Sequence, residues 1–108
     1  MRKYIIGRMR VKPGTRDELL AASKPFIAAT RKEPGCLFFE MAISDTDPDG
    51  LVVVEEFTDE AAHQSHDKSA HMETFRVSLR KLLTEAEFEF IYSDKIENNG
   101  GKISRPIT

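Results

Sequence analysis

Two histidines close together in the sequence carry the side chains best suited to proton transfer. His66 and His71 are separated by the segment Asp-Lys-Ser-Ala. A neutral imidazole takes up a proton near pH 7, so either histidine can serve as a general base. We expect one of them to face a pocket while Glu55 accepts a hydrogen bond from its other ring nitrogen and fixes the tautomer. The structural alternative is that both histidines cap or tether a break between two helices.

A metal site is a second use for these residues. His63 lies three residues before His66, and residues at this spacing are neighbours on a helix. Glu55 would join them, but the sequence offers no further ligand at a defined spacing. Cys36 is the only cysteine, which excludes an intramolecular disulfide and a cysteine cluster within one subunit. We therefore expect no metal ion, and a partly exposed surface position for His63.

Charged and aromatic residues complete the list of site candidates. Glu55 lies on the apolar face of a predicted strand, so its carboxylate needs a partner. An arginine such as Arg31 could form a structural ion pair with it, as could Arg8 or Arg10. Arg31 could instead hold an anionic part of a ligand or form a solvated helix end. Most aromatic side chains belong to the core, and we expect Phe57 and Phe75 to line the pocket.

The first half of the chain reads as a strand, a helix and a second strand. Alternation over residues 3–11 predicts a strand, which Pro13-Gly14 ends. Thr15 stands three residues before Glu18, the spacing of a capping box, and predicts a helix start. The following helix should bury the side containing Leu19 and Phe26, with a kink or restart at Pro25. Residues 36–43 alternate again and predict the second strand.

The second half repeats the pattern. A turn-rich segment leads to a strand over residues 51–57. Thr58 or Asp59 can cap a short helix that ends near His66, and Ser69 can cap a longer one. A last strand includes Phe88 and Tyr92. This order is the split βαβ arrangement, a ferredoxin-like α+β fold with a four-stranded antiparallel sheet and helices on one face.

The opposite face of such a sheet has no helix to cover it. Phe38 and both sides of the third strand are apolar, so we expect a second copy of the chain to pack there and form a homodimer. Residues 1–97 form the single predicted domain, and residues 98–108 a polar C-terminal tail that is mobile or packed on a partner.

Composition narrows the classes of function. The 108 residues carry a formal net charge of -2, and no run of basic residues is longer than a pair. Binding to nucleic acid is therefore not expected, and neither is binding to a membrane. The apolar stretch near the N-terminus breaks at Arg8, too early for a signal sequence or a membrane span. One unpaired cysteine and the lack of a targeting segment indicate a cytoplasmic protein.

Four short segments resemble the antibiotic biosynthesis monooxygenase family of small dimeric α/β-barrel proteins. Residues 33–37 (Glu-Pro-Gly-Cys-Leu) are similar to that family's turn into its second strand. Residues 55–59 (Glu-Glu-Phe-Thr-Asp) resemble the end of its third strand, residues 66–71 its two-histidine segment, and residues 11–14 the end of its first strand. One departure is Phe57, where many members carry tryptophan, which argues against the haem-degrading relatives.

The resemblance implies a dimeric barrel and a small-molecule substrate. Members of the family are known as cofactor-free oxygenases of quinols and related aromatics and as isomerases of small phosphorylated sugars. Our first hypothesis is therefore a cofactor-independent monooxygenase of a small hydroxylated aromatic, in which His66 deprotonates the substrate. The second is an isomerase of a small oxygenated or phosphorylated metabolite. The third is a non-enzymatic ligand-binding module related to stress.

Overall fold

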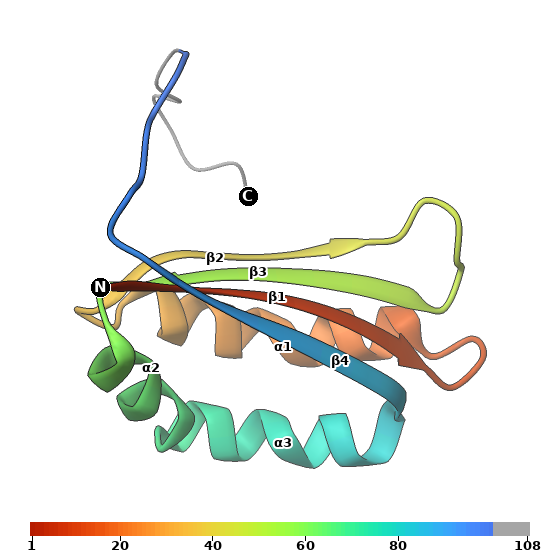
Figure 1. Cartoon of the computed structure of the whole chain (residues 1–108). Coiled ribbons are helices and arrows are strands. Elements are labelled where there is room, and N and C mark those ends of the chain that lie inside the picture. The colour runs from red at the N-terminus through yellow and green to blue at the C-terminus, as the bar shows by residue number, and fades with distance from the viewer. Residues whose placement is uncertain (101–108) are drawn as a thin grey trace.

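The protein folds into two layers, a sheet and a layer of helices (Figure 1). The computed structural model describes residues 1–100, so most of the predicted tail, from residue 101 on, lies outside the described residues. The elements follow in the order β1 (Arg2–Val11), α1 (Arg16–Arg31), β2 (Cys36–Ile43), β3 (Gly50–Phe57), α2 (Glu60–Asp67), α3 (Ala70–Leu82) and β4 (Leu83–Ser93).

The sheet is antiparallel throughout, with the strand order β2-β3-β1-β4. Its two central strands, β1 and β3, are the first and third strands in the chain, as the split βαβ arrangement requires. The helices of the described residues, α1, α2 and α3, lie on the same side of the sheet (Figure 1). The predicted ferredoxin-like α+β fold is therefore confirmed.

The first helix begins differently from the prediction. Thr15 precedes α1, but its hydroxyl donates to the carbonyl of Lys12 at 2.7 Å and accepts no amide of the helix. The reason is its backbone, with φ −107° and ψ 6°, since a capping side chain needs an extended conformation. Gly14, with φ +78°, makes the preceding turn. The helix then continues through Pro25 without a restart.

The caps of the other two helices match the prediction and set the positions of the histidines. Asp59 accepts from the amide of Ala62 at 2.8 Å, and Ser69 accepts from the amide of Met72 at 3.2 Å. The Ser69 hydroxyl also donates to the carbonyl of His66 at 2.7 Å. One serine thus both starts α3 and closes the end of α2, which holds the two helices at a fixed break.

Alternate residues of each strand face the helices and form the core. Leu19, Phe26 and Thr30 of α1 are buried against it, as is Ser23. Residues paired across the strands lie on the same face of a sheet, and one such row on the helix side contains Phe39, Glu55, Ile5 and Phe90. The sheet therefore holds one carboxylate, that of Glu55, within an otherwise apolar row.

The opposite face of the sheet carries no helix among the described residues (Figure 1). A row across it contains Phe38, Glu56, Tyr4 and Ile91. Phe38 is 39% exposed and Ile91 is 43% exposed. This is the uncovered apolar face that the sequence predicts, and the dimer that would cover it stays a prediction.

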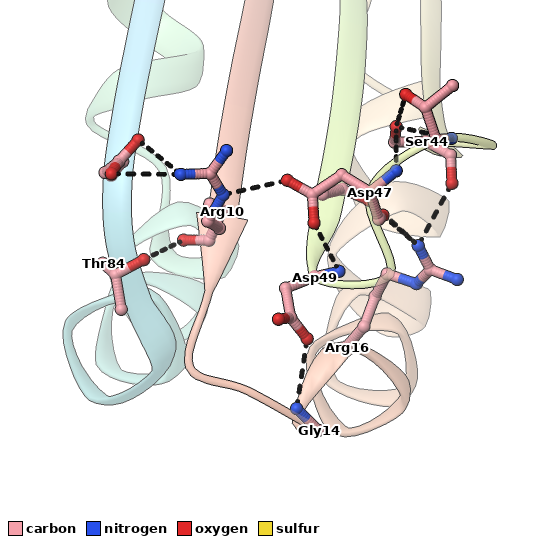
Figure 2. A network of polar contacts seen from close by, with 10 residues as sticks. Arg10, Gly14, Arg16, Ser44, Asp47, Asp49 and Thr84 are labelled. Carbon is pink, nitrogen blue, oxygen red and sulfur yellow. Dashed lines mark hydrogen bonds and ion pairs between the residues drawn. The ribbon is translucent and has the colours of Figure 1, made fainter.

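At the end of the sheet away from α2, a polar network ties the β2–β3 loop to the rest of the fold (Figure 2). Arg10 donates to Asp47 at 2.9 Å and to Glu85 at 3.2 Å. Arg16 donates to the Asp47 carbonyl at 2.9 Å, and Asp49 accepts the amide of Gly14 at 3.1 Å. These contacts anchor the loop without making a buried site.

Candidate functional site

A cavity of about 260 Å³ lies between the sheet and the helices α2 and α3. Much of its wall is aromatic or sulfur-containing, from Phe26, Phe39, Phe75, Phe88, Phe90, Met9, Met41 and Met72. Its polar lining comes from Glu55, His63, His66, Asp67 and Arg76. A few convergent polar groups in an apolar cavity are typical of a small-molecule site.

His66 is held in one orientation by a carboxylate. Its side chain is 3% exposed, and its Nδ1 lies 2.9 Å from Oε2 of Glu33. An ionised carboxylate can only accept, so Nδ1 carries the hydrogen and donates it. In the neutral ring, Nε2 is then left with a free lone pair. This nitrogen lies 3.9 Å from Oε1 of Glu55, and both residues line the cavity.

Glu55 is therefore not the residue that fixes the tautomer, contrary to the prediction. Its distance to Nε2 is too long for a hydrogen bond, and Glu33 holds the opposite nitrogen. Burial, with the nearby charges of Asp67 and Glu33, raises the pKa of Glu55 to about 8. At neutral pH this carboxyl is mostly protonated and can donate a hydrogen bond into the cavity.

The expected arginine partners of Glu55 lie elsewhere. Arg8 and Arg10 project from the opposite face of β1, where they pair with Glu89, Asp47 and Glu85. Arg31 donates to the carbonyl of Phe39 at 2.7 Å and lies 3.5 Å from Glu40. In the described part of the chain Arg31 does not line the cavity. Its contacts with Phe39 and Glu40 join α1 to β2.

His71 shares the carboxylate of Glu33 but faces a different space. Its Nε2 lies 2.5 Å from the same Oε2 atom that His66 contacts. The side chain is 24% exposed and lines a groove between α1 and α3, together with Pro25 and Ser78. Of the two predicted histidines, His66 borders the cavity and His71 lies behind it.

His63 is buried, and the expected surface position is wrong. It lies one helical turn before His66, so the face of α2 that packs on the sheet buries both rings. Its ring lies 5.2 Å from that of Phe57 and 5.8 Å from that of Phe90. Burial lowers the pKa of His63, which favours the neutral ring. Its Nε2 is 3.6 Å from Asp67.

The two predicted aromatic residues occupy different places. Phe75 lines the cavity and stacks on Phe26 with ring centroids 4.4 Å apart. Phe57 is fully buried behind the histidines, with its ring 5.2 Å from those of both His63 and His66. Phe57 therefore supports the histidine rings and does not border the cavity of the described residues.

Sequence reasoning missed Glu33, the carboxylate at the centre of the site. It occupies the turn after α1, which reaches α2 because Gly35 carries no side chain. A Cβ on Gly35 would lie 2.3 Å from that of Ala62. The amide of Thr58 also donates to the Gly35 carbonyl at 2.9 Å. The available signal was the glycine in the Glu-Pro-Gly turn, which permits this close approach.

Gly7 shapes the opposite wall in a similar way. It is paired with Phe88 across β1 and β4 and with Val53 across β1 and β3. A Cβ on Gly7 would lie 2.6 Å from both side chains. The missing side chain leaves room for the Phe88 ring above the sheet, where the ring closes part of the cavity wall.

Fold and cavity together define a ferredoxin-like α+β protein with a buried histidine at a small apolar site. The family model described as antibiotic biosynthesis monooxygenase matches residues 4–77. The chain therefore belongs to the antibiotic biosynthesis monooxygenase family, as its four short segments predict.

Two curated proteins are similar in sequence. "Uncharacterized protein sll1783" of Synechocystis sp. is 28% identical over 71 residues, which are 66% of this chain and 48% of that protein. This chain thus spans about half the length of that relative. "Putative monooxygenase YcnE" of Bacillus subtilis is 28% identical over 76 residues, covering 70% of this chain and 80% of YcnE.

Solved structures share the fold. Rv0793 from Mycobacterium tuberculosis superposes with a TM-score of 0.82 at 24% identity, covering 91% of this chain and all of that one. Protein SO0527 from Shewanella oneidensis has a TM-score of 0.78 at 26% identity, covering 83% of this chain and 88% of that one. Among the described residues, no helix is long and apolar enough to cross a membrane.

Proposed function

We propose that the protein is a cofactor-independent monooxygenase that oxidises a small hydroxylated aromatic, such as a quinol, in the cytoplasm. The observation that carries the proposal is the orientation of His66. Glu33 holds its Nδ1–H, and its Nε2 lone pair lies beside Glu55 at an aromatic cavity. Membership of the monooxygenase family and the similarity to YcnE support the same class of reaction.

The chemistry begins with proton transfer. His66 Nε2 accepts the proton of a substrate hydroxyl, and the Glu33 carboxylate stabilises the imidazolium that forms. The aromatic oxyanion that remains is electron-rich and gives one electron to O₂. The substrate radical and superoxide then combine to form a C–O bond at a ring carbon that carries hydrogen.

The second half of the reaction breaks the O–O bond. The distal peroxide oxygen takes up two protons and leaves as water while the ring carbon loses its hydrogen as a proton, so the two protons balance the substrate hydroxyl proton held by His66 and the one released from the ring carbon. That carbon becomes a carbonyl, so one phenol C–H and one O₂ give a quinone and one H₂O. Protonated Glu55 is a suitable donor for the leaving oxygen because it lies beside Nε2 of His66. The apolar walls keep water from the reactive pair.

The cavity suits a flat aromatic substrate. Phe26 and Phe75 form a stacked pair at one wall, and Phe39 meets Phe26 edge to face with ring centroids 5.5 Å apart. Rings of a substrate can pack against these faces with offset or edge contacts. A strongly charged substrate would find fewer partners, because most of the lining is apolar.

A homodimer is part of the proposal. The uncovered sheet face presents Phe38, Tyr4, Ile6, Val54 and Ile91 in adjacent positions. A second copy of the chain offers the same apolar surface and can bury it around a two-fold axis. Light scattering at micromolar concentration should give about twice the chain mass of 12.2 kDa. A mass equal to one chain would refute the dimer.

The direct test is oxygen uptake by metal-stripped protein with a panel of quinols and phenols. His66→Gln should lower the rate by about two orders of magnitude, as loss of a general base does. Gln64→Ala is the control, since it changes an exposed residue of the same helix that does not line the cavity. A rate unaffected by His66→Gln would refute the assignment of the base.

An isomerase is the second candidate, and the His66–Glu55 pair is the observation that favours it. A basic nitrogen and a protonated carboxyl 3.9 Å apart can move a proton between two substrate positions without any oxidant. Turnover under strictly anaerobic conditions distinguishes the two. An isomerase keeps its rate without oxygen, whereas the proposed monooxygenase loses it.

A further inference from the structure

Three donor atoms from three separate segments meet behind the cavity. Oε2 of Glu33 contacts both Nδ1 of His66 and Nε2 of His71. The ligand atoms of these three residues all lie within 4.8 Å of one another. Glu33 comes from the turn after α1, His66 from α2 and His71 from α3. The side chains are 17%, 3% and 24% exposed, so this is a largely enclosed cluster.

The donor set is that of a transition-metal site. Two imidazole nitrogens and one carboxylate oxygen are the three protein ligands of many catalytic zinc sites, with a fourth position left open. Donors bound at about 2.0–2.1 Å to a tetrahedral ion lie about 3.3 Å apart. Glu33 Oε2 lies 2.9 Å from His66 Nδ1 and 2.5 Å from His71 Nε2. Shifts of roughly 1 Å would let the donors surround an ion.

The surrounding structure holds these ligands in place without a metal. The Ser69 hydroxyl fixes the break between His66 and His71 by bonding to the His66 carbonyl at 2.7 Å. The amide of Glu33 donates to the Thr30 carbonyl at 3.0 Å, which orders the turn. Such preorganisation lowers the cost of ordering the ligands when an ion binds.

We propose that Glu33, His66 and His71 form a binding site for a divalent transition-metal ion such as Zn²⁺. The set differs from the His63, His66 and Glu55 group that the sequence brings to attention. In the structure His63 Nε2 lies 3.6 Å from Asp67. His66 presents Nε2 to Glu55, whereas its Nδ1 contacts Glu33.

Occupation of the site would change what His66 can do. A metal on Nδ1 displaces the hydrogen from that nitrogen, and a neutral ring then carries its hydrogen on Nε2. Nε2 no longer has a lone pair for a substrate proton. Bound Zn²⁺ therefore inhibits the reaction in which His66 acts as the base. This inhibition rests on the proposed function, whereas the metal site itself does not.

The site is tested by titrating metal-stripped, full-length protein without an affinity tag with Co²⁺ alone. Visible absorption of four-coordinate Co²⁺ should appear and saturate at one ion per chain. His71→Gln and Glu33→Gln should each weaken Co²⁺ binding by at least about tenfold, since loss of even an outer-shell partner has an effect of this size. His63→Gln, the control, should bind Co²⁺ as the unchanged protein does.

Two results would overturn the metal site: no saturable Co²⁺ binding, or equal binding by the unchanged protein and His71→Gln. If the site does bind metal, one equivalent of Zn²⁺ should suppress oxygen uptake by the unchanged protein. Uptake that persists with the site filled would overturn the inhibitory role. If no substrate is oxidised at all, the proposed function fails, while the Co²⁺ titration still decides the metal site.

Discussion

The two ends of the sheet each contain a carboxylate that joins several partners, but in very different surroundings. At one end Glu33 lies between His66 and His71, where the His66 side chain is 3% exposed. At the other end Asp47 binds Arg10, whose side chain is 50% exposed, in the network of Figure 2. The bond lengths are alike, 2.9 Å for Glu33–His66 and 2.9 Å for Asp47–Arg10.

The comparison shows that burial, and not bond geometry, separates a candidate site from a surface tether. Exposed ion pairs are screened by water and salt and contribute little to stability. In the buried cluster the same type of contact decides which nitrogen of His66 carries hydrogen. The variants below test this difference at both ends of the sheet.

The largest effect is expected for Glu33→Gln. The amide keeps the size of the side chain but removes the charge that stabilises the imidazolium, so kcat for quinol oxidation should fall by about a hundredfold with little change in KM. Steady-state oxygen uptake measures both. Glu18→Gln is the control, because it alters an exposed carboxylate paired with Lys81 at 2.9 Å. Equal kcat values for the two variants would remove Glu33 from the mechanism.

A second effect concerns Glu55 and pH. Folding raises its pKa from 4.5 to about 8, so the folded protein favours the protonated carboxyl. The contribution of protonated Glu55 to the stability of the folded protein is fully present below about pH 4.5 and is lost as pH rises through about 8. Between pH 6 and pH 8 the unchanged protein should lose on the order of 2–3 kcal/mol relative to Glu55→Gln.

Urea unfolding of both proteins at several pH values measures this difference. Parallel stability curves for the unchanged protein and Glu55→Gln would show that the carboxyl is already ionised in the folded state. Asp17→Asn, at an exposed position in the first turn of α1, serves as the control and should leave the pH dependence as it is.

A third, smaller effect is expected at Thr30, near the buried cluster. Its side chain is fully buried, and its hydroxyl has no hydrogen-bond partner among the described residues. Thr30→Val replaces the hydroxyl with a methyl group of similar size and should stabilise the protein by about 1 kcal/mol. Thr30→Ser keeps the hydroxyl and loses the methyl group, so it should destabilise. A lower Tm for Thr30→Val than for the unchanged protein in thermal unfolding would contradict this prediction.

The smallest effect is expected for Asp47→Asn. It removes the charge from the exposed network and should cause a slight loss of stability that about 0.5 M NaCl abolishes. Oxygen uptake should stay at the level of the unchanged protein, because Asp47 is not part of the cavity lining. A fall in kcat similar to that of Glu33→Gln would mean that burial does not separate the two ends.

The sequence by itself determined the order and type of the elements, the helix cap at Ser69 and the family, and it narrowed the cap of the preceding helix to Thr58 or Asp59. These depend on local rules, since alternation, helical spacing and capping are decided by residues close together in the chain. His66, Glu55 and Phe75 were singled out as residue types in such patterns, and all three line the cavity, while their roles stay a prediction.

Only the tertiary structure decided which groups meet. From the sequence, Glu55 at the end of a strand was the expected partner of the pocket histidine, yet the turn after α1 docks against α2 at Gly35 and brings Glu33 to Nδ1 of His66. The same packing buries His63 and turns His71 to the groove between α1 and α3. Local periodicity sets which face a side chain occupies, but contacts between distant segments depend on how whole elements pack.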